Sequence, residues 1–157
     1  MHIPASSSGK YHPQDSLGEA GLVRHSMAVA IIAYVICELE YLQITPIDKS
    51  FIFAACLLHD TFKQGREESG TTVRTHPNIA AQEIYNFGKL VGEEKIGKAI
   101  ATLVVSHMGQ WGNQKPGSRV QFIVHLADFI ASRKWLKIDF SETIEKAKRA
   151  RKALEIN

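Results

Sequence analysis

The chain has 157 residues, 45% of them hydrophobic and 22% charged, and carries a formal net charge of +3 at pH 7. This length and balance suit one globular domain with a substantial core, and so small a charge does not by itself argue for nucleic-acid binding. The longest apolar run, at residues 27–37, is too short to span a bilayer, and the polar residues 1–8 do not resemble a secretory signal.

Two cysteines, Cys37 and Cys56, lie inside apolar runs and form no CxxC spacing. They are typical of core residues in a reducing compartment. We therefore expect a cytoplasmic protein that has no contact with a membrane. No feature of the sequence points to a particular protein partner or oligomeric state.

Helical periodicity dominates the chain, and no stretch alternates with a period of two, so we predict an all-α fold without a sheet. Ser16 and Glu19 have the spacing of a capping box and predict a first helix that is apolar nearly all round and therefore central. Thr45 and Pro46 predict the start of the second helix, which reaches His59. The six helices are expected at residues 16–42, 46–59, 77–88 with His76 as cap, 93–108, 118–133 and 141–155. We expect them to form one domain over residues 1–157.

The main chemical signal lies at residues 57–63, where an apolar helical run leads into His59 and Asp60. A buried imidazole beside a buried carboxylate is costly unless something compensates both, and a metal ion is the simplest compensation. Asp60 has two oxygens, so it can bridge two cations. Further residues of ligand type lie mostly near the ends of the expected helices: His25, His76, His107 and Asp128.

Four imidazoles and two carboxylates suit Mn, Fe, Co, Ni or Zn better than Mg or Ca. Six ligands around a bridging carboxylate indicate two divalent metal ions. Such a pair can hold a bridging hydroxide and bind two oxygens of one phosphate.

Five segments carry a joint resemblance to a known family: Gly-Leu-Val-Arg-His-Ser (21–26), His-Asp-Thr-Phe-Lys (59–63), His-Pro-Asn-Ile-Ala-Ala (76–81), Val-Val-Ser-His (104–107) and Leu-Ala-Asp-Phe-Ile-Ala-Ser-Arg (126–133). Over roughly residues 11–135 the chain resembles the HD-domain superfamily of metal-dependent phosphohydrolases. The branch that degrades cyclic di-GMP has paired histidines and a Gly-Tyr-Pro motif. Here Met108 follows His107 and residues 109–113 lack that motif, so the resemblance is to the two-metal branch instead.

The resemblance implies an all-α helical bundle and a role for each matched residue. One metal would be held by His25, His59, Asp60 and Asp128, and the other by Asp60, His76 and His107. Lys63, one turn beyond His59 and Asp60, would be a catalytic cation that binds the phosphate. The C-terminal helix, residues 141–155, lies outside the motif-bearing core.

Each of these residues also has a structural interpretation. A histidine at a helix end can be a cap or a core residue, which applies most to His76 because His-Pro is a plausible cap, and Lys63 can be a solvated lysine. His125 could orient Asp128 or be a core histidine. Four more residues could contact the phosphate or base of a substrate, with loop packing or solvated charge as the alternative: His12, Arg74, Trp111 and Arg133.

The expected function is hydrolysis of a phosphomonoester or phosphodiester bond in a small phosphorylated substrate, a nucleotide or short oligonucleotide. A metal-bridging hydroxide would attack phosphorus while Lys63 and the second metal neutralise the developing charge. Two alternatives remain open. One is a di-iron oxygenase, resembling myo-inositol oxygenase, which shares the ligand order and would consume oxygen. The other is a non-catalytic HD module that binds a ligand, although such modules usually lose ligands and none is missing here.

Overall fold

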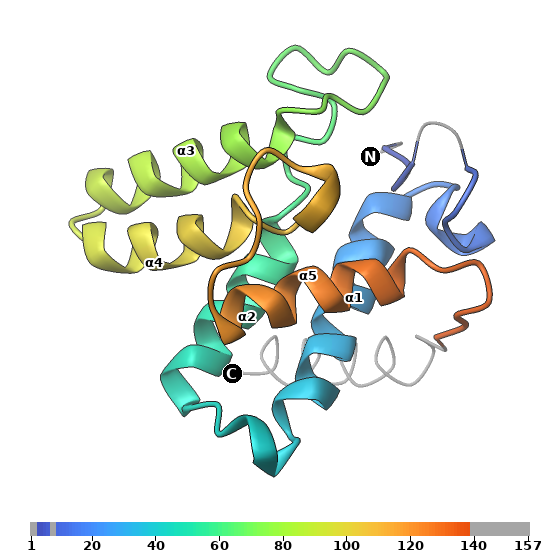
Figure 1. The fold of residues 1–157 in the computed structure, drawn as a ribbon. Helices are drawn as coiled ribbons and strands as arrows, with labels where there is room; N and C mark the ends of the chain where they lie inside the picture. Colours follow the sequence, from blue (N-terminus) through green and yellow to red (C-terminus); the bar gives the residue numbers. More distant parts are fainter. Residues whose placement is uncertain (1–2, 7–8, 139–157) are drawn as a thin grey trace, which may run out of the picture.

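The computed structural model describes residues 3–6 and 9–138, and this part of the chain is built from helices (Figure 1). The α-helices are α1 (Gly21–Cys37), α2 (Pro46–Leu58), α3 (His76–Leu90), α4 (Glu94–Val104) and α5 (Arg119–Ala131), and the short 3-10 helices are η1 (Gln14–Ser16), η2 (Glu40–Leu42) and η3 (Gly109–Trp111). The predicted all-α class is confirmed, with five α-helices in the described residues. The sixth predicted helix, at residues 141–155, lies outside them. None of the described helices is long and apolar enough to cross a bilayer.

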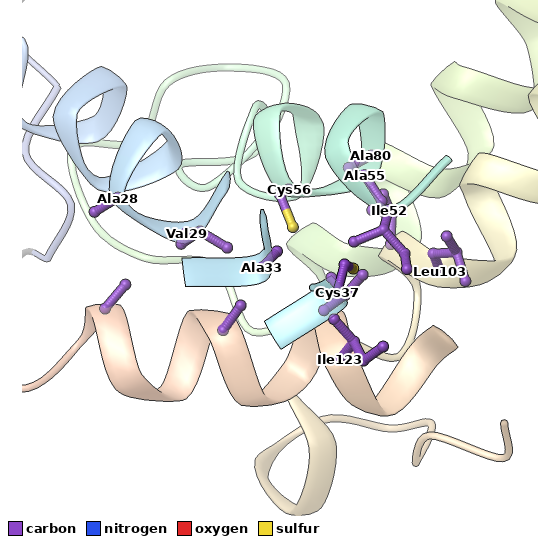
Figure 2. Packing of buried hydrophobic residues seen from close by; sticks show 14 of the residues in the cluster. Ala28, Val29, Ala33, Cys37, Ile52, Ala55, Cys56, Ala80, Leu103 and Ile123 are labelled. Atoms are coloured by element: carbon purple, nitrogen blue, oxygen red, sulfur yellow. The ribbon is translucent and has the colours of Figure 1, made fainter. Parts of the chain in front are cut away.

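Helix α2 packs against α1, α4 and α5. Helices α3 and α4 pack along each other as a hairpin that extends from the other helices (Figure 1). The core where the helices meet consists mainly of small and branched side chains, among them Ala33, Ile52 and Ile123 (Figure 2). Cys37 and Cys56 are free and buried in this core, as predicted. Small side chains allow close approach of the helices while the interior stays densely packed.

Two of the predicted helix caps are confirmed. The hydroxyl oxygen of Thr45 accepts a hydrogen bond from the amide of Asp48 at 3.2 Å, and Pro46 follows as the first helical residue. The hydroxyl of Ser118 accepts from the amide of Gln121 at 3.3 Å. Both caps satisfy amides that the first turn of a helix leaves without a partner.

The first helix was predicted wrongly at both ends. Ser16 belongs to η1 and is buried, and its carbonyl oxygen accepts from the amide of Ala5 at 2.8 Å. The chain then turns at Ala20, which has a left-handed φ of 55°, so that α1 begins at Gly21. The helix ends at Cys37, and Leu39 is extended with φ −71° and ψ 110°. The long-range contact with Ala5 therefore replaces the local capping box.

Helix α1 is also less enclosed than its apolar sequence predicted. Val23, Tyr34 and Val35 are 48%, 53% and 61% exposed. Its opposite side buries Val29 and Ala33 completely against α2 and α5. A helix that is apolar on all sides is therefore not always fully buried, because its neighbours can cover only part of its surface.

Three further helix ends differ from the prediction. Helix α3 begins at His76 with Thr75 as cap residue, and it continues through Gly88 to Leu90. Gly88 does not end the helix because it serves the crossing with α4, where a Cβ on Gly88 would lie 2.8 Å from Gly97 Cα. Helix α4 ends at Val104, so His107 lies in the turn that follows and not within the helix.

Candidate metal centre

All five α-helices bring a candidate ligand to one buried place. His25 lies in α1, Asp128 lies in α5, and His76 is the first residue of α3. His59 and Asp60 directly follow α2, and His107 follows α4. The five residues other than Asp128 are at most 1% exposed, and the side chain of Asp128 is 16% exposed. The structure therefore brings together the complete predicted set: His25, His59, Asp60, His76, His107 and Asp128.

The two oxygens of Asp60 face different histidines. Oδ1 lies 2.9 Å from Nε2 of His76 and 3.7 Å from Nε2 of His107. Oδ2 lies 3.3 Å from Nε2 of His59 and 3.8 Å from Nε2 of His25. This division is the same as the one that the family resemblance implies.

Asp128 belongs to the group of residues around Asp60 Oδ2. Its Oδ1 lies 3.0 Å from Nε2 of His25 and 3.7 Å from Nε2 of His59. The donor atoms of His25, His59 and Asp128 all lie within 4.8 Å of one another, and so do those of His59, Asp60 and His107. The first set belongs to the Oδ2 group, whereas the second set joins His59 to His107 across the division, and each set is compact enough to surround one ion.

Backbone carbonyls fix the orientation of three imidazole rings. The Nδ1 atoms of His59, His76 and His107 lie 2.8, 2.7 and 2.8 Å from the carbonyl oxygens of Cys56, Val73 and Val104, in each case three residues earlier. A carbonyl oxygen only accepts, so Nδ1 donates its proton and Nε2 keeps a lone pair. All three Nε2 lone pairs therefore face Asp60, the arrangement that a metal-binding histidine needs.

Several buried polar atoms have no partner that could satisfy them. His59 Nε2 and Asp60 Oδ1 make no hydrogen bond. The Nε2 atoms of His76 and His107 lie 3.2 Å apart, where two lone pairs would repel each other without a cation. Buried atoms of this kind carry a large desolvation penalty. Divalent metal ions in the two groups would satisfy all four atoms, so the residues present fit such ions.

The pKa shifts favour the protonation states that metal binding requires. Burial opposes the charge on Asp60, yet Lys63 and His59 nearby hold its pKa well below its usual range. Burial likewise opposes the charge on Asp128, but its hydrogen bond with His25 and the adjacent histidines keep its pKa low. Burial lowers the pKa of His107 to about 3, with the nearby His59 adding to the effect. At neutral pH both carboxylates are charged and His107 is neutral.

The pKa of His59 is shifted upward, in contrast to the lowered pKa of His107. Burial is the largest single effect and would lower its pKa, but the neighbouring carboxylates of Asp60 and Asp128 together outweigh burial and raise the pKa above its ordinary value. A metal ion at the same place would replace the proton that the His59 ring would otherwise bind.

Lys63 lies beside Asp60 and also reaches the pocket. Its Nζ is 2.5 Å from Asp60 Oδ2, and its side chain is 11% exposed. It lines the pocket above the cluster. Lys63 therefore forms an ion pair with Asp60 and places its ammonium group at the cavity.

A cavity of about 400 Å³ opens directly over the cluster. Of the ligands it exposes His76, His107 and Asp128, and three of the four further residues that the sequence suggested, His12, Trp111 and Arg133, also line it. Arg74 is exposed and does not line this cavity, so its suggested contact with the substrate is not supported. Sequence reasoning missed Tyr11 and Phe129, whose only signal was their position beside His12 and Asp128.

His125 does not orient Asp128. Its Nδ1 donates to the carbonyl oxygen of His107 at 2.7 Å. Its ring lies against Gly109, where φ is 55° and where a Cβ would overlap with the imidazole. His125 thus holds the turn that carries His107, which is a positioning role at a different ligand from the one suggested.

Comparison with known proteins agrees with this geometry. The family model of the HD domain matches residues 22–132. A curated relative, the dihydroneopterin 2′,3′-cyclic phosphate phosphodiesterase of Methanocaldococcus jannaschii, is 29% identical over 120 residues, an alignment that covers 70% of this chain and 45% of the relative. The chain thus spans less than half the length of that relative. No solved structure matches the chain.

Proposed function

The chain belongs to the HD-domain family, and from this premise we propose that it is a metal-dependent phosphohydrolase that cleaves a phosphodiester bond in a small phosphorylated compound. The observation that carries the proposal is the position of Asp60, whose two oxygens face two separate groups of histidines. A carboxylate in this position suits a pair of divalent ions. The open cavity above it gives a substrate access to the same atoms.

Six residues would hold the ions. His25, His59, Asp128 and Oδ2 of Asp60 form one group, and His76, His107 and Oδ1 of Asp60 form the other. When bound, divalent metals would activate water and offset negative charge on a phosphate. The chemistry of the nitrogen-rich donors favours Mn, Fe, Co, Ni or Zn.

The chain's own residues supply the remaining functions. Lys63 places its ammonium group at the edge of the cluster and stabilises negative charge on the phosphate oxygens. The fixed imidazole rings need no reorganisation during the reaction, because their Nδ1 atoms are anchored to backbone carbonyls. The candidate ligands are largely buried, so substrate and water approach them through the cavity.

The preference for a diester comes from the relative, whose printed activity is on a cyclic phosphodiester of a pterin compound. Nucleotides and short oligonucleotides belong to the same chemical class of phosphoesters carrying a flat ring. A cyclic phosphodiester is therefore the first substrate to test.

The test is a hydrolysis screen of the metal-stripped and reloaded protein. Nucleoside 2′,3′-cyclic phosphates, 3′,5′-cyclic phosphates, nucleoside monophosphates and a short oligonucleotide are each supplied with Mn, Co, Ni, Fe or Mg. We expect metal-dependent release of a monoester from a diester, and loss of that activity in Asp60→Asn. The matched control is Asp15→Asn, which removes an exposed carboxylate that does not line the cavity.

Two results would contradict the proposal. Oxygen uptake by the iron-loaded protein without any hydrolysis would assign the same ligands to an oxygenase. Binding of phosphoesters without turnover under every metal would make the chain a ligand-binding module.

A further inference from the structure

One wall of the cavity is aromatic and comes from two separate elements. Trp111 of η3 and Phe129 of α5 have nearly parallel rings, with an interplanar angle of 6° and centroids 5.7 Å apart. Trp111 remains 48% exposed even though it contacts Phe129. Both residues line the cavity over the candidate metal centre. The indole of Trp111 is therefore partly open and forms part of the cavity wall.

Arg133 fixes the far side of this wall. Its guanidinium lies 4.1 Å from the centroid of the Phe129 ring and 5.9 Å from that of Tyr11. Its Nε donates to the carbonyl oxygen of Phe129 at 3.0 Å. Guanidinium–aromatic contacts of this kind hold both partners in place. Arg133 thus supports Phe129 and adds a positive charge to the cavity that it lines.

The charge and size of the cavity restrict its ligand. Lys63 and Arg133 give it two cations, and Asp128 is the only carboxylate among the described residues that line it. Its volume of about 400 Å³ lies at the lower end of the range for small-molecule sites, which is about 300–1,000 Å³. An anion of the size of one nucleotide matches this volume, and a longer oligonucleotide would have to extend outside the cavity.

Building on the proposed phosphodiesterase function, we propose that the substrate is a mononucleotide-sized phosphodiester whose planar heteroaromatic ring stacks on Trp111. In this orientation the phosphate lies toward Asp60 and Lys63. Arg133 attracts any anionic substrate, whereas Trp111 selects those that carry a flat ring. Stacking of one ring on an aromatic side chain corresponds to about 10- to 100-fold in affinity.

The first test compares two cyclic diesters that differ in the ring. Adenosine 2′,3′-cyclic phosphate has an aromatic base, and glycerol 1,2-cyclic phosphate has none. Trp111→Ala is expected to lower kcat/KM for the adenosine compound about 10- to 100-fold and to leave the glycerol compound nearly unchanged. Trp111→Phe is expected to restore most of the lost activity, because it keeps an aromatic face. Arg133→Gln is expected to raise KM for both compounds.

The matched control is Trp135→Ala, which removes a tryptophan that is 71% exposed and does not line the cavity. It should leave both rates unchanged. An equal loss on both substrates in Trp111→Ala, or no loss on either, would overturn the role of Trp111. An oligonucleotide cleaved as fast as the adenosine compound would overturn the size limit.

A second test measures binding without catalysis. The chain has two tryptophans, so Trp135→Phe leaves Trp111 as the sole indole fluorophore. Adenosine 2′-monophosphate should quench its fluorescence in the metal-free protein, and inorganic phosphate should not. Quenching without any hydrolysis by the wild type would sustain the ring site and reject the phosphodiesterase. Hydrolysis without quenching, and with equal rates for both diesters, would sustain the phosphodiesterase and reject the ring site.

Discussion

At the scale of single residues, the helix ends account for the way the histidines point. The last carbonyls of a helix have no partner within it, and the Nδ1 protons of His59 and His107 bind to such carbonyls, those of Cys56 and Val104. His76, at the start of α3, donates its Nδ1 proton to the carbonyl oxygen of Val73 in the preceding loop. Short-range backbone geometry therefore decides the tautomer, and the tautomer directs each Nε2 lone pair toward Asp60.

A first prediction concerns His76. His76→Ala should leave the group around Asp60 Oδ2 intact, because His76 lies 2.9 Å from Oδ1. We expect the loss of about one metal equivalent per chain, and a fall in hydrolysis of several orders of magnitude, because a Lewis acid contributes several kcal/mol to the transition state.

Metal content by elemental analysis and turnover should be measured on the same preparation. His12→Ala is the control for metal content, since it removes a histidine outside the six ligands. Unchanged metal and turnover in His76→Ala would make His76 a purely structural residue.

A second prediction concerns acid stability without metal. The pKa of His107 falls to about 3 because of burial, so below its unfolded value of about 6.5 the unfolded chain binds a proton that the folded chain does not. The free energy of unfolding should therefore decrease as the pH falls, by about 2 kcal/mol between pH 6.5 and pH 5. His59 opposes part of this loss, since its pKa is raised.

Urea unfolding of chelator-treated protein at the two pH values measures the effect. In His107→Gln the loss between pH 6.5 and pH 5 should be clearly smaller. An identical loss in the variant would mean that other groups dominate the acid response.

At the scale of elements, the α3–α4 hairpin connects packing to the site. The two helices run in opposite directions, so His76 at the start of α3 and the His107 turn after α4 lie at the same end. Gly88 and Gly97 allow the helices to cross at close range, with Cβ positions that would meet the opposite Cα at 2.8 and 2.9 Å. The separation of these helices therefore influences the two histidines that face Asp60 Oδ1.

A third prediction tests this crossing. Gly97→Ala should lower the free energy of unfolding by about 1–3 kcal/mol, because overpacking forces the two backbones apart. The intrinsic preference of alanine for helices, about 1 kcal/mol, acts in the opposite direction. Chemical denaturation measures the change, and Gly18→Ala is the control because a Cβ there meets nothing within 4 Å. A stabilised Gly97→Ala protein would contradict the close crossing.

At the scale of the whole molecule, the cluster links distant parts of the chain. His25 and Asp128 are 103 residues apart in the sequence, yet His25 Nε2 lies 3.0 Å from Asp128 Oδ1. The six residues lie in, or within three residues after, the five described α-helices. An ion at this place would bind only the folded chain, so binding and folding are coupled.

A fourth prediction follows from this coupling. Mn or Co at 100 times the dissociation constant should add about 2.7 kcal/mol of stability, which corresponds to a rise in Tm of about 5–10 °C for a chain of this size. Thermal unfolding with and without metal measures the rise, and a chelator should reverse it. Asp60→Asn should lose most of the rise, whereas an unchanged rise would place the metal elsewhere.

The sequence by itself determined the features that depend on neighbouring residues. Helical periodicity, the caps at Thr45 and Ser118 and the all-α class were predicted correctly because their hydrogen bonds and apolar spacings are local. The order of His25, His59, Asp60, His76, His107 and Asp128 identified the six residues before any distance was known. Their motifs, read together, also indicated the family.

Only the tertiary structure decided which of these residues meet, and how. The Ser16 carbonyl pairs with Ala5 and moves the start of α1, and His125 contacts His107 and not Asp128. Tyr11 and Phe129 enter the cavity, whereas Arg74 stays outside it. These outcomes depend on how segments far apart in the sequence pack together, and no local pattern encodes that packing. The division of the ligands between the two oxygens of Asp60 arises in the same way, because it requires five helices to converge on one carboxylate.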